Sequence, residues 1–326
     1  MDLINLIREK SKFFENDECY QGLQAIITHI EIAERHFKKG KNGEEYFYTD
    51  VIYRTNQAFE GALKEAYKII SSKRQKKITS YEIEKFLENE NKLKERVLSL
   101  FTNYRKEWRN KSAHDYKLYF SDQEAFLAIV SICAFINILL DQMIEAYGIK
   151  EGKEEAKKID FSLHQDRDIL ETISELLIQF STITPSKAKS QGKASLILNE
   201  REMIGMLYSY IGESKLGFEV FQEAILFSNT GYKSRIDLLV NKDDQRVIIE
   251  VKNLRGRNKE LVSSGIQQVL NYLQVNQFTT GILYIPPIFS KSKMIVEDLD
   301  TKVGDASYKV RAIYPEFLSS QDRQDS

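Results

Sequence analysis

Two short apolar runs on either side of a polar turn constrain the fold of this chain more than any other feature. The runs occupy residues 236–240 and 247–251, and the residues between them include two consecutive aspartates, Asp243 and Asp244. Apolar, β-branched runs around such a turn predict an antiparallel β-hairpin. If the turn is centred between the two aspartates, residues whose numbers have the same sum lie opposite each other.

This register gathers charged side chains on one face of the predicted hairpin. Asp237 lies opposite Glu250, and directly opposed side chains have their Cβ atoms only about 4.5–5.5 Å apart. Lys252, which lies opposite Arg235, shares this face because it is two residues from Glu250 in one strand. Two carboxylates this close repel each other unless a proton or a cation lies between them. The spacing suits Mg²⁺ or Mn²⁺, which bind through one or two carboxylates and keep several waters.

An aspartate at the end of one strand followed by Glu-x-Lys on the next, here IDLLV and IEVK, resembles the PD-(D/E)XK nuclease superfamily. A helix predicted at residues 264–275 carries Gln268 and Tyr272 four residues apart, hence on one face. This Gln-x3-Tyr pair resembles the additional motif of the RecB-like branch. With a predicted helix at residues 199–211 and a strand before the hairpin, the order helix, three strands, helix, strand is similar to the superfamily core.

The resemblance implies an enzyme that hydrolyses phosphodiester bonds of nucleic acid with Mg²⁺ or Mn²⁺ as cofactor. It favours an endonuclease, and DNA over RNA as the substrate. Asp237, Glu250 and the backbone carbonyl of Val251 would then hold one or two divalent ions. Lys252 would orient or deprotonate the attacking water, and the pair Gln268 and Tyr272 would shape the substrate side of the pocket.

Glu200 is a further candidate ligand for the metal. At about 100° per residue it lies on the same helical stripe as Ile204 and Leu207, so its carboxylate should face the sheet. Several families of the superfamily use an inward carboxylate here as an extra metal or water ligand. The alternative is an ordinary first-turn glutamate that the helix dipole favours. Asn199 and Glu202 predict a capping box, in which Glu202 points away from the core.

Three basic residues follow the predicted hairpin with no acid between them: Arg255, Arg257 and Lys259. Such a run is usually a solvated loop, but beside an acidic metal patch it favours a grip on phosphates. The formal net charge of the whole chain is −1. Because this gives no general attraction to nucleic acid, binding must depend on a local basic patch.

The first 147 residues contain no proline and predict an all-α bundle of four or five helices. Ser121 and Glu124 predict a capping box that opens a helix running to about Tyr147, and Gly148 is expected to close it. Residues 125–140 are apolar on nearly every face. This run is shorter than the roughly 20 residues of a membrane span and contains Asn137, so it predicts a buried core helix.

Within the bundle, the segment WRNKSAHDY contains Arg109-Asn110-x3-His114, which resembles the short motif of the HEPN family. Many members are metal-independent ribonucleases whose site forms across a dimer. His114 could exchange a proton with a ribose 2′-hydroxyl or a leaving oxygen, and Arg109 could brace the phosphate. The alternative is that both residues only pin the connection between two helices. The bundle would then be a non-catalytic domain that dimerises the chain or docks a partner.

The sequence thus predicts a multidomain α and α/β protein. Residues 1–148 form the HEPN-like helical bundle, and residues 149–193 form a charged connector with one amphipathic helix. Residues 194–318 form a restriction-endonuclease-like α/β domain with a mixed central sheet, and residues 319–326 form a disordered tail. The segment TITPSKAKSQGK, residues 182–193, is the predicted boundary between the domains.

The expected partners are nucleic acid and a second copy of the chain, bound through the N-terminal bundle. Both families recur in prokaryotic antiviral defence, which suggests a further partner protein from such a system. With no signal peptide, no membrane association and two distant cysteines that fit neither a disulfide framework nor a zinc site, a cytoplasmic protein is expected. The alternative function is a metal-independent RNase toxin whose C-terminal domain binds nucleic acid without cutting it.

Overall fold

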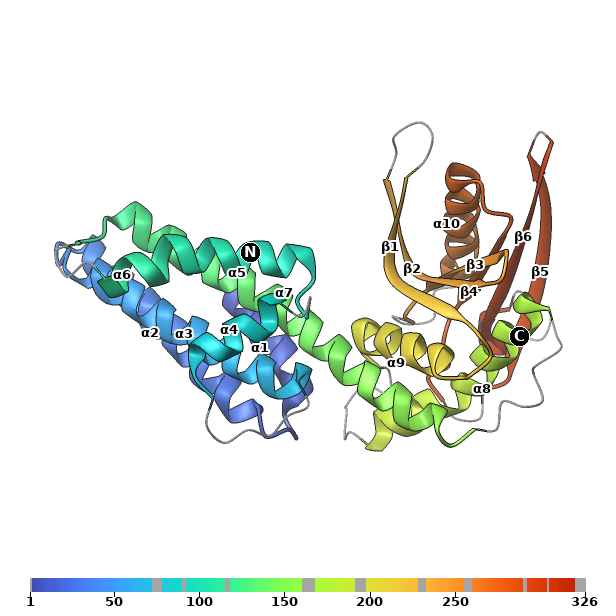
Figure 1. Cartoon of the computed structure of the whole chain (residues 1–326), viewed down its shortest axis with the longest axis horizontal. Helices are drawn as coiled ribbons and strands as arrows, with labels where there is room; N and C mark the ends of the chain where they lie inside the picture. Colours follow the sequence, from blue (N-terminus) through green and yellow to red (C-terminus); the bar gives the residue numbers. More distant parts are fainter. Residues whose placement is uncertain are drawn as a thin grey trace, which may run out of the picture. The chain divides into compact units, whose positions relative to one another are not determined.

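The computed structural model describes most of the chain and divides it into two compact units. Described are residues 2–71, 78–89, 92–114, 118–159, 168–190, 198–227, 233–254, 260–289, 292–303 and 305–319, with the backbone alone at residues 89, 113–114, 185–190 and 227. Unit 1 spans Met1–Ala146 and unit 2 spans Tyr147–Ser326. The described part of unit 1 is helical, and unit 2 combines helices with a mixed sheet (Figure 1).

Unit 1 is a bundle of helices, as its proline-free and strand-poor sequence predicts. Its elements are α1 (Leu3–Ser11), η1 (Lys12–Phe14), α2 (Tyr20–Lys41), α3 (Phe47–Ile70), α4 (Ser80–Asn89), α5 (Glu95–Tyr104), the π-helical turn η2 (Arg105–Arg109), α6 (Asn110–His114) and the first part of α7 (Asp122–Ala156). The predicted capping box at the start of α7 is present. Glu124 N–H donates to Ser121 Oγ at 3.3 Å, and Ser121 N–H donates to a Glu124 carboxylate oxygen at 2.9 Å.

Helix α7 supplies the centre of the unit 1 core. Ile132, Phe135 and Leu139 are each at most 1 % exposed, which confirms the prediction of a buried core helix. By length and composition α7 could cross a membrane, but 56 % of its most apolar stretch is buried inside the protein. The apolar character of this helix is therefore matched by the neighbouring helices of the bundle.

The prediction that Gly148 closes this helix is wrong, because α7 continues to Ala156. A Cβ on Gly148 would lie 2.1 Å from the Glu202 backbone oxygen, and one on Gly152 would lie 2.2 Å from the Met206 backbone oxygen. The two glycines allow α7 to approach α9 (Glu200–Gly212) backbone to backbone. Gly148 therefore serves the close packing of two helices and does not mark the end of α7.

Unit 2 contains the predicted order of helix, three strands, helix and strand. After α8 (Ile169–Ser190) come α9, β1 (Glu219–Phe227), β2 (Lys233–Lys242), β3 (Gln245–Val251), α10 (Glu260–Asn276), β4 (Thr280–Tyr284), β5 (Met294–Val303), β6 (Ala306–Pro315) and η4 (Glu316–Leu318). The strand order across the described sheet is β1-β2-β3-β4-β6-β5. The β3–β4 and β4–β6 pairs are parallel and the other pairs are antiparallel, so the sheet is mixed.

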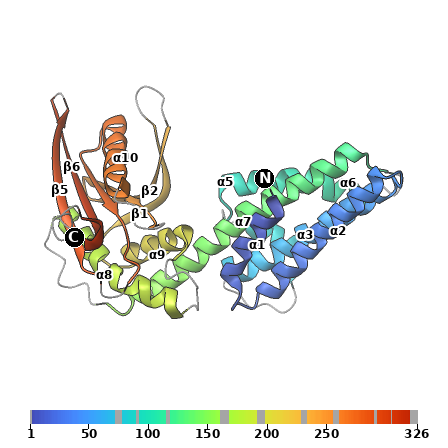
Figure 2. The same cartoon turned by 180° about the vertical axis from the view of Figure 1, so that it is seen from behind.

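Helices cover both faces of this sheet. Helix α10 shares one buried core with Ile248 and Leu283, whereas α8 and α9 share another with Ile249 and Val251 (Figures 1 and 2). Successive residues of β3 thus enter opposite cores, as the two-residue period of a strand requires. The middle of the sheet is buried on both faces, which explains why its strands read as continuous apolar runs.

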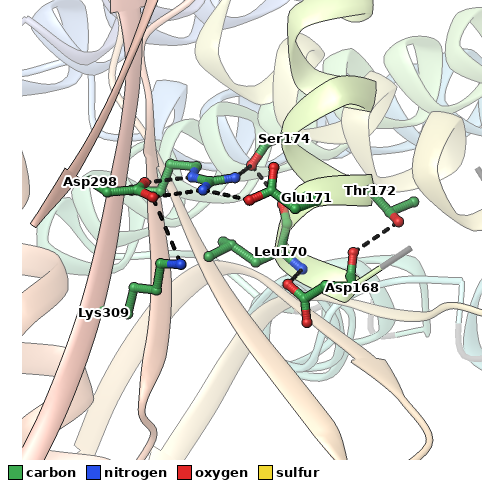
Figure 3. A network of polar contacts seen from close by, with 8 residues as sticks. Asp168, Leu170, Glu171, Thr172, Ser174, Asp298 and Lys309 are labelled. Atoms are coloured by element: carbon green, nitrogen blue, oxygen red, sulfur yellow. Dashed lines mark hydrogen bonds and ion pairs between the residues drawn. The ribbon is translucent and has the colours of Figure 1, made fainter. Parts of the chain in front are cut away.

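The predicted connector is part of unit 2. Helix α8 runs through residues 182–190, where the sequence predicts a boundary, and the two units divide earlier, between Ala146 and Tyr147. A buried arginine of β6 holds α8 against the sheet. Arg311 is 5 % exposed, binds Asp298 of β5 with two hydrogen bonds of 2.6 and 2.7 Å, and reaches Glu171 at 2.7 Å (Figure 3). The amphipathic stripe of α8 is therefore a sheet-covering face, which its sequence position alone did not show.

Candidate active site

The hairpin that dominates the sequence is formed by β2 and β3, with the predicted register. The paired residues run from Leu238 opposite Ile249 to Lys242 opposite Gln245, and Asp243 and Asp244 make the turn between the strands. Asp237 lies one residue beyond the last pair. In place of a backbone pair, its carboxylate accepts the Val251 N–H at 2.8 Å. The aspartate therefore sits where β2 and β3 stop pairing.

The alternation of β2 is interrupted at this aspartate. Ile236 and Leu239 enter the core beneath α10, whereas Leu238 and Val240 enter the core beneath α8 and α9. Residues two apart in a regular strand share a face, so Ile236 and Leu238 should not be separated. The irregularity falls at Asp237, which lies between these two residues, although the β1–β2 register is the same on either side of it, at Gln222–Leu238 and Ala224–Ile236.

The carboxylates of Asp237 and Glu250 form an acidic pair. Glu250 is 3 % exposed and Asp237 is half-buried, and the negative charge of Glu250 acts on the pKa of Asp237. Burial, together with the negative charge of Glu250, raises the pKa of Asp237 to about 7. Burial also raises the pKa of Glu250, although the hydrogen bond from Lys252 opposes this. The pair therefore holds a proton at a pH at which isolated carboxyls are ionised.

Lys252 is the basic partner of this pair. Its Nζ donates to Glu250 Oε1 at 2.6 Å, and its side chain is 27 % exposed. Burial acts to lower the pKa of Lys252, but the Glu250 hydrogen bond and the nearby carboxylates raise it on balance. Lys252 is thus a protonated ammonium that reaches both the buried acids and solvent. Arg235 is not paired with Lys252 in the described β2–β3 ladder, which ends at Leu238 and Ile249, and its side chain is exposed.

Gln268 and Tyr272 of α10 lie at the same site. Gln268 Nε2 donates to the Tyr272 hydroxyl at 2.6 Å, and both side chains are partly buried. Burial, opposed by the Gln268 hydrogen bond, raises the pKa of Tyr272, and the charges of Glu250 and Asp237 add to the increase. The Tyr272 hydroxyl is therefore within electrostatic range of the acidic pair and lies on the same face of α10 as Gln268.

Glu200, at the first residue of α9, also lies near the pair. Its negative charge raises the pKa of both Asp237 and Glu250. Unlike the apolar residues of its predicted stripe, Glu200 is exposed, so its carboxylate is at the rim of the site. The Asn199–Glu202 capping box is present, but Glu202 is 0 % exposed. Its predicted outward orientation is wrong, because the C-terminal part of α7 packs over this turn at Gly148.

Two residues at the site were not singled out from the sequence. Glu223 of β1 lies opposite Asp237, between the pairs Gln222–Leu238 and Ala224–Ile236, and has a positive φ of 46°. Its carboxylate forms an ion pair with Arg201 of α9. A glutamate in a strand carries no signal of a left-handed backbone, so only the structure reveals this feature.

The predicted phosphate-binding run of Arg255, Arg257 and Lys259 lies outside the described residues. The side chain of His114 is likewise not described, although its backbone ends α6. Arg109 is described and is already engaged. Its guanidinium lies 3.8 Å from a Glu60 carboxylate oxygen, 3.9 Å from one of Glu84, and donates to Asn110 Oδ1 at 3.1 Å. These contacts connect the motif with α3 and α4.

The donor set at the hairpin fits a hard divalent cation. Asp237 and Glu250 are adjacent oxygen donors, and Mg²⁺ binds in proteins through one or two carboxylates with water completing the shell. No described group of three or more His, Cys, Asp or Glu side chains is arranged to hold a metal. The site therefore offers two close carboxylates with Glu200 at its rim. No known family model, curated protein or solved structure matches the chain.

Proposed function

We propose that unit 2 is a metal-dependent nuclease of the PD-(D/E)XK type, with DNA favoured over RNA and internal cleavage favoured over cleavage from an end. The observation that carries the proposal is the pair of half-buried Asp237 and buried Glu250, with Lys252 Nζ at 2.6 Å from Glu250 Oε1. Burying two adjacent acids is unfavourable unless a proton or cation compensates them. The element order around the pair and the Gln268–Tyr272 face support the same class.

In this proposal Asp237, Glu250 and the backbone carbonyl of Val251 hold Mg²⁺ or Mn²⁺. The bound ion would polarise the scissile phosphate and lower the pKa of a water molecule. Lys252 orients that water and offsets the negative charge that develops on the phosphate. Its hydrogen bond to Glu250 holds the ammonium at the mouth of the site.

Tyr272 and Gln268 line the α10 side of the site. Their mutual hydrogen bond fixes the direction of the tyrosine hydroxyl. A neutral hydroxyl and amide can contact a phosphate or sugar oxygen without competing for the cation. The pair therefore positions substrate, and the basic run at residues 255–259 would extend this contact along the nucleic acid.

A second candidate function concerns unit 1, which we propose to be a HEPN-like bundle that dimerises the chain and that carries a separate RNase site or a regulatory surface. The π-helical turn Arg105–Arg109 ends at the first residue of the motif, and such turns are frequent at functional sites. The engagement of Arg109 by Glu60 and Glu84 favours the scaffold role over the catalytic role. In that case unit 2 is the only catalytic unit.

The test is incubation of the chain with end-labelled DNA and RNA, each with Mg²⁺ and with EDTA. We expect cleavage with Mg²⁺ that EDTA abolishes and that Glu250→Gln removes. Glu213→Gln, on the C-cap of α9, is the matched control because it also removes one carboxylate from unit 2. Cleavage that survives EDTA and Glu250→Gln but fails in His114→Ala would instead favour the metal-independent RNase. We also propose that the chain acts in prokaryotic antiviral defence, together with a partner protein from such a system.

A further inference from the structure

Glu223 is held in a backbone conformation that is unfavourable for a residue with a side chain. Its φ of +46° lies in the left-handed region, where the Cβ of an L-residue comes too close to the following carbonyl oxygen. It lies opposite Asp237, at the point where the facing alternation of β2 also breaks. Local strain persists only where the surrounding structure compensates it, and it collects at functional sites.

The compensating contact is an ion pair that joins β1 to the first turn of α9. The Glu223 carboxylate binds the Arg201 guanidinium, and their side chains are only 12 % and 28 % exposed. Arg201 directly follows Glu200, the first residue of α9. The strained strand residue is therefore tied to the turn of α9 that carries Glu200.

Two weaker contacts join the same end of α9 to the strands that carry the site. Asn253, which follows Lys252, donates from Nδ2 to the Leu198 carbonyl at 3.2 Å. Gln222, which precedes Glu223, donates from Nε2 to the Ile204 carbonyl at 3.4 Å. Both use side-chain amides and backbone carbonyls, so neither depends on charge. The Arg201–Glu223 pair adds a charged contact at this end of α9.

We propose that Glu223 and Arg201 form a positioning pair that fixes the first turn of α9, and with it Glu200, beside Asp237 and Glu250. The pair thereby sets how tightly the site binds a divalent cation. This inference rests on the proposed metal-dependent function of the site. Neither residue touches the reacting atoms, and their effect is carried by the backbone of α9 and β1.

The test measures Mn²⁺ binding to the full chain by calorimetry, in parallel with the Mn²⁺ concentration that half-saturates DNA cleavage. Glu223→Gln and Arg201→Gln should each weaken Mn²⁺ binding about tenfold, the scale found for residues that position metal ligands. The Arg201 variant is decisive because the two explanations predict opposite changes in Mn²⁺ affinity. Removing a positive charge near a cation site should strengthen binding if the residue acts only through its charge, and should weaken binding if it positions Glu200.

Two further variants separate positioning from general damage. The exchange Arg201→Glu with Glu223→Arg restores an ion pair of opposite polarity and should recover most of the lost affinity. In a Glu200→Gln background, Arg201→Gln should have little additional effect, since residues that act through one another are not additive. The control is Glu213→Ala, which breaks the 3.0 Å ion pair between Lys153 and the other end of α9 and should leave Mn²⁺ affinity unchanged.

The outcomes distinguish this inference from the function on which it rests. If the wild-type chain binds and uses Mn²⁺ while Arg201→Gln binds it equally well or more tightly, the positioning pair is refuted and the nuclease site stands. If Arg201→Gln weakens binding but remains fully additive with Glu200→Gln, the pair does not act through Glu200 and the inference also fails. If the wild-type chain neither binds Mn²⁺ nor cleaves, the proposed function falls and this inference falls with it.

Discussion

Replacing Asp237 by asparagine should make the protein more stable while removing its metal-dependent cleavage. Asparagine has nearly the shape of aspartate, and its side-chain oxygen can still accept the Val251 N–H that Asp237 accepts at 2.8 Å. The substitution therefore removes a buried charge without removing the hydrogen bond that ends the β2–β3 ladder. The change in the free energy of unfolding therefore measures how much the charge of Asp237 destabilises the folded protein.

The magnitude follows from the pKa of this carboxyl. It ionises near pH 7 in the folded protein and near pH 4 in an unfolded chain. At about 1.4 kcal/mol for each pH unit between these values, ionisation destabilises the folded state by about 4 kcal/mol above pH 7. Lys252 loses one favourable neighbour in the variant, so we expect a net gain of about 2 kcal/mol.

The sign of the pH dependence is fixed by the same values. Between pH 4 and pH 7 the folded protein holds a proton on Asp237 that the unfolded chain has released, so the stability of the wild type falls as the pH rises. Asparagine cannot ionise. The stability difference between the variant and the wild type should therefore be near zero at pH 4, grow through pH 5 and 6, and level off above pH 7.

Thermal melts followed by circular dichroism at pH 5 and pH 8, without metal, measure this difference. A gain of about 2 kcal/mol raises the melting temperature of a unit of this size by about 4–8 °C at pH 8. Asp244→Asn, in the exposed turn of the same hairpin, is the control and should show no such pH-dependent gain. Added Mg²⁺ should stabilise the wild type and not Asp237→Asn. A variant that is less stable at pH 8, or that still cleaves DNA with Mg²⁺, would refute the reasoning.

Three further changes test other parts of the proposal. His114→Ala should leave metal-dependent cleavage intact and, if unit 1 is an RNase, should erase an EDTA-resistant activity that leaves 2′,3′-cyclic phosphate ends; loss of the metal-dependent activity in a folded variant would contradict this. Gly148→Ala should lower the melting temperature, since its Cβ would lie 2.1 Å from the Glu202 oxygen and overpacking costs about 1–3 kcal/mol, whereas Gly212→Ala, with 3.9 Å to Val220, should not. Light scattering at micromolar concentration should show a homodimer through unit 1, and a strict monomer would contradict that expectation.

Local sequence patterns were sufficient for the hairpin and its charged face. The period of two and the paired aspartates predict the register of β2 and β3, because both act within a few residues of the turn. The Gln268–Tyr272 face follows equally from the period of a helix. In each case the interacting residues are near neighbours in the sequence or are aligned by a single turn.

Other features depend on contacts between distant segments and have no such local pattern. The burial of Glu202 results from α7 packing over it at Gly148, and the continuation of α7 results from the same contact. Strand β5 escaped prediction because most of it is exposed on both faces, so it lacks an apolar alternation. Strand β6 was not predicted either, although residues 310–315 are buried. Arg311 is buried in this hairpin only because Asp298 and Glu171 neutralise it.

The charges at the end of the hairpin provide an independent argument for a divalent cation. When fully ionised, Asp237, Glu250 and Glu200 contribute three negative charges that interact with one another, and Lys252 contributes one positive charge. Among the described residues named here, the two negative charges that remain match the charge of one Mg²⁺ in magnitude. The Arg201–Glu223 pair is neutral and leaves this balance unchanged. A site kept for stability alone would gain from losing one acid, as Asp237→Asn is expected to show. Retaining the acids at the cost of stability, beside a strained Glu223, is what a cation-binding role requires.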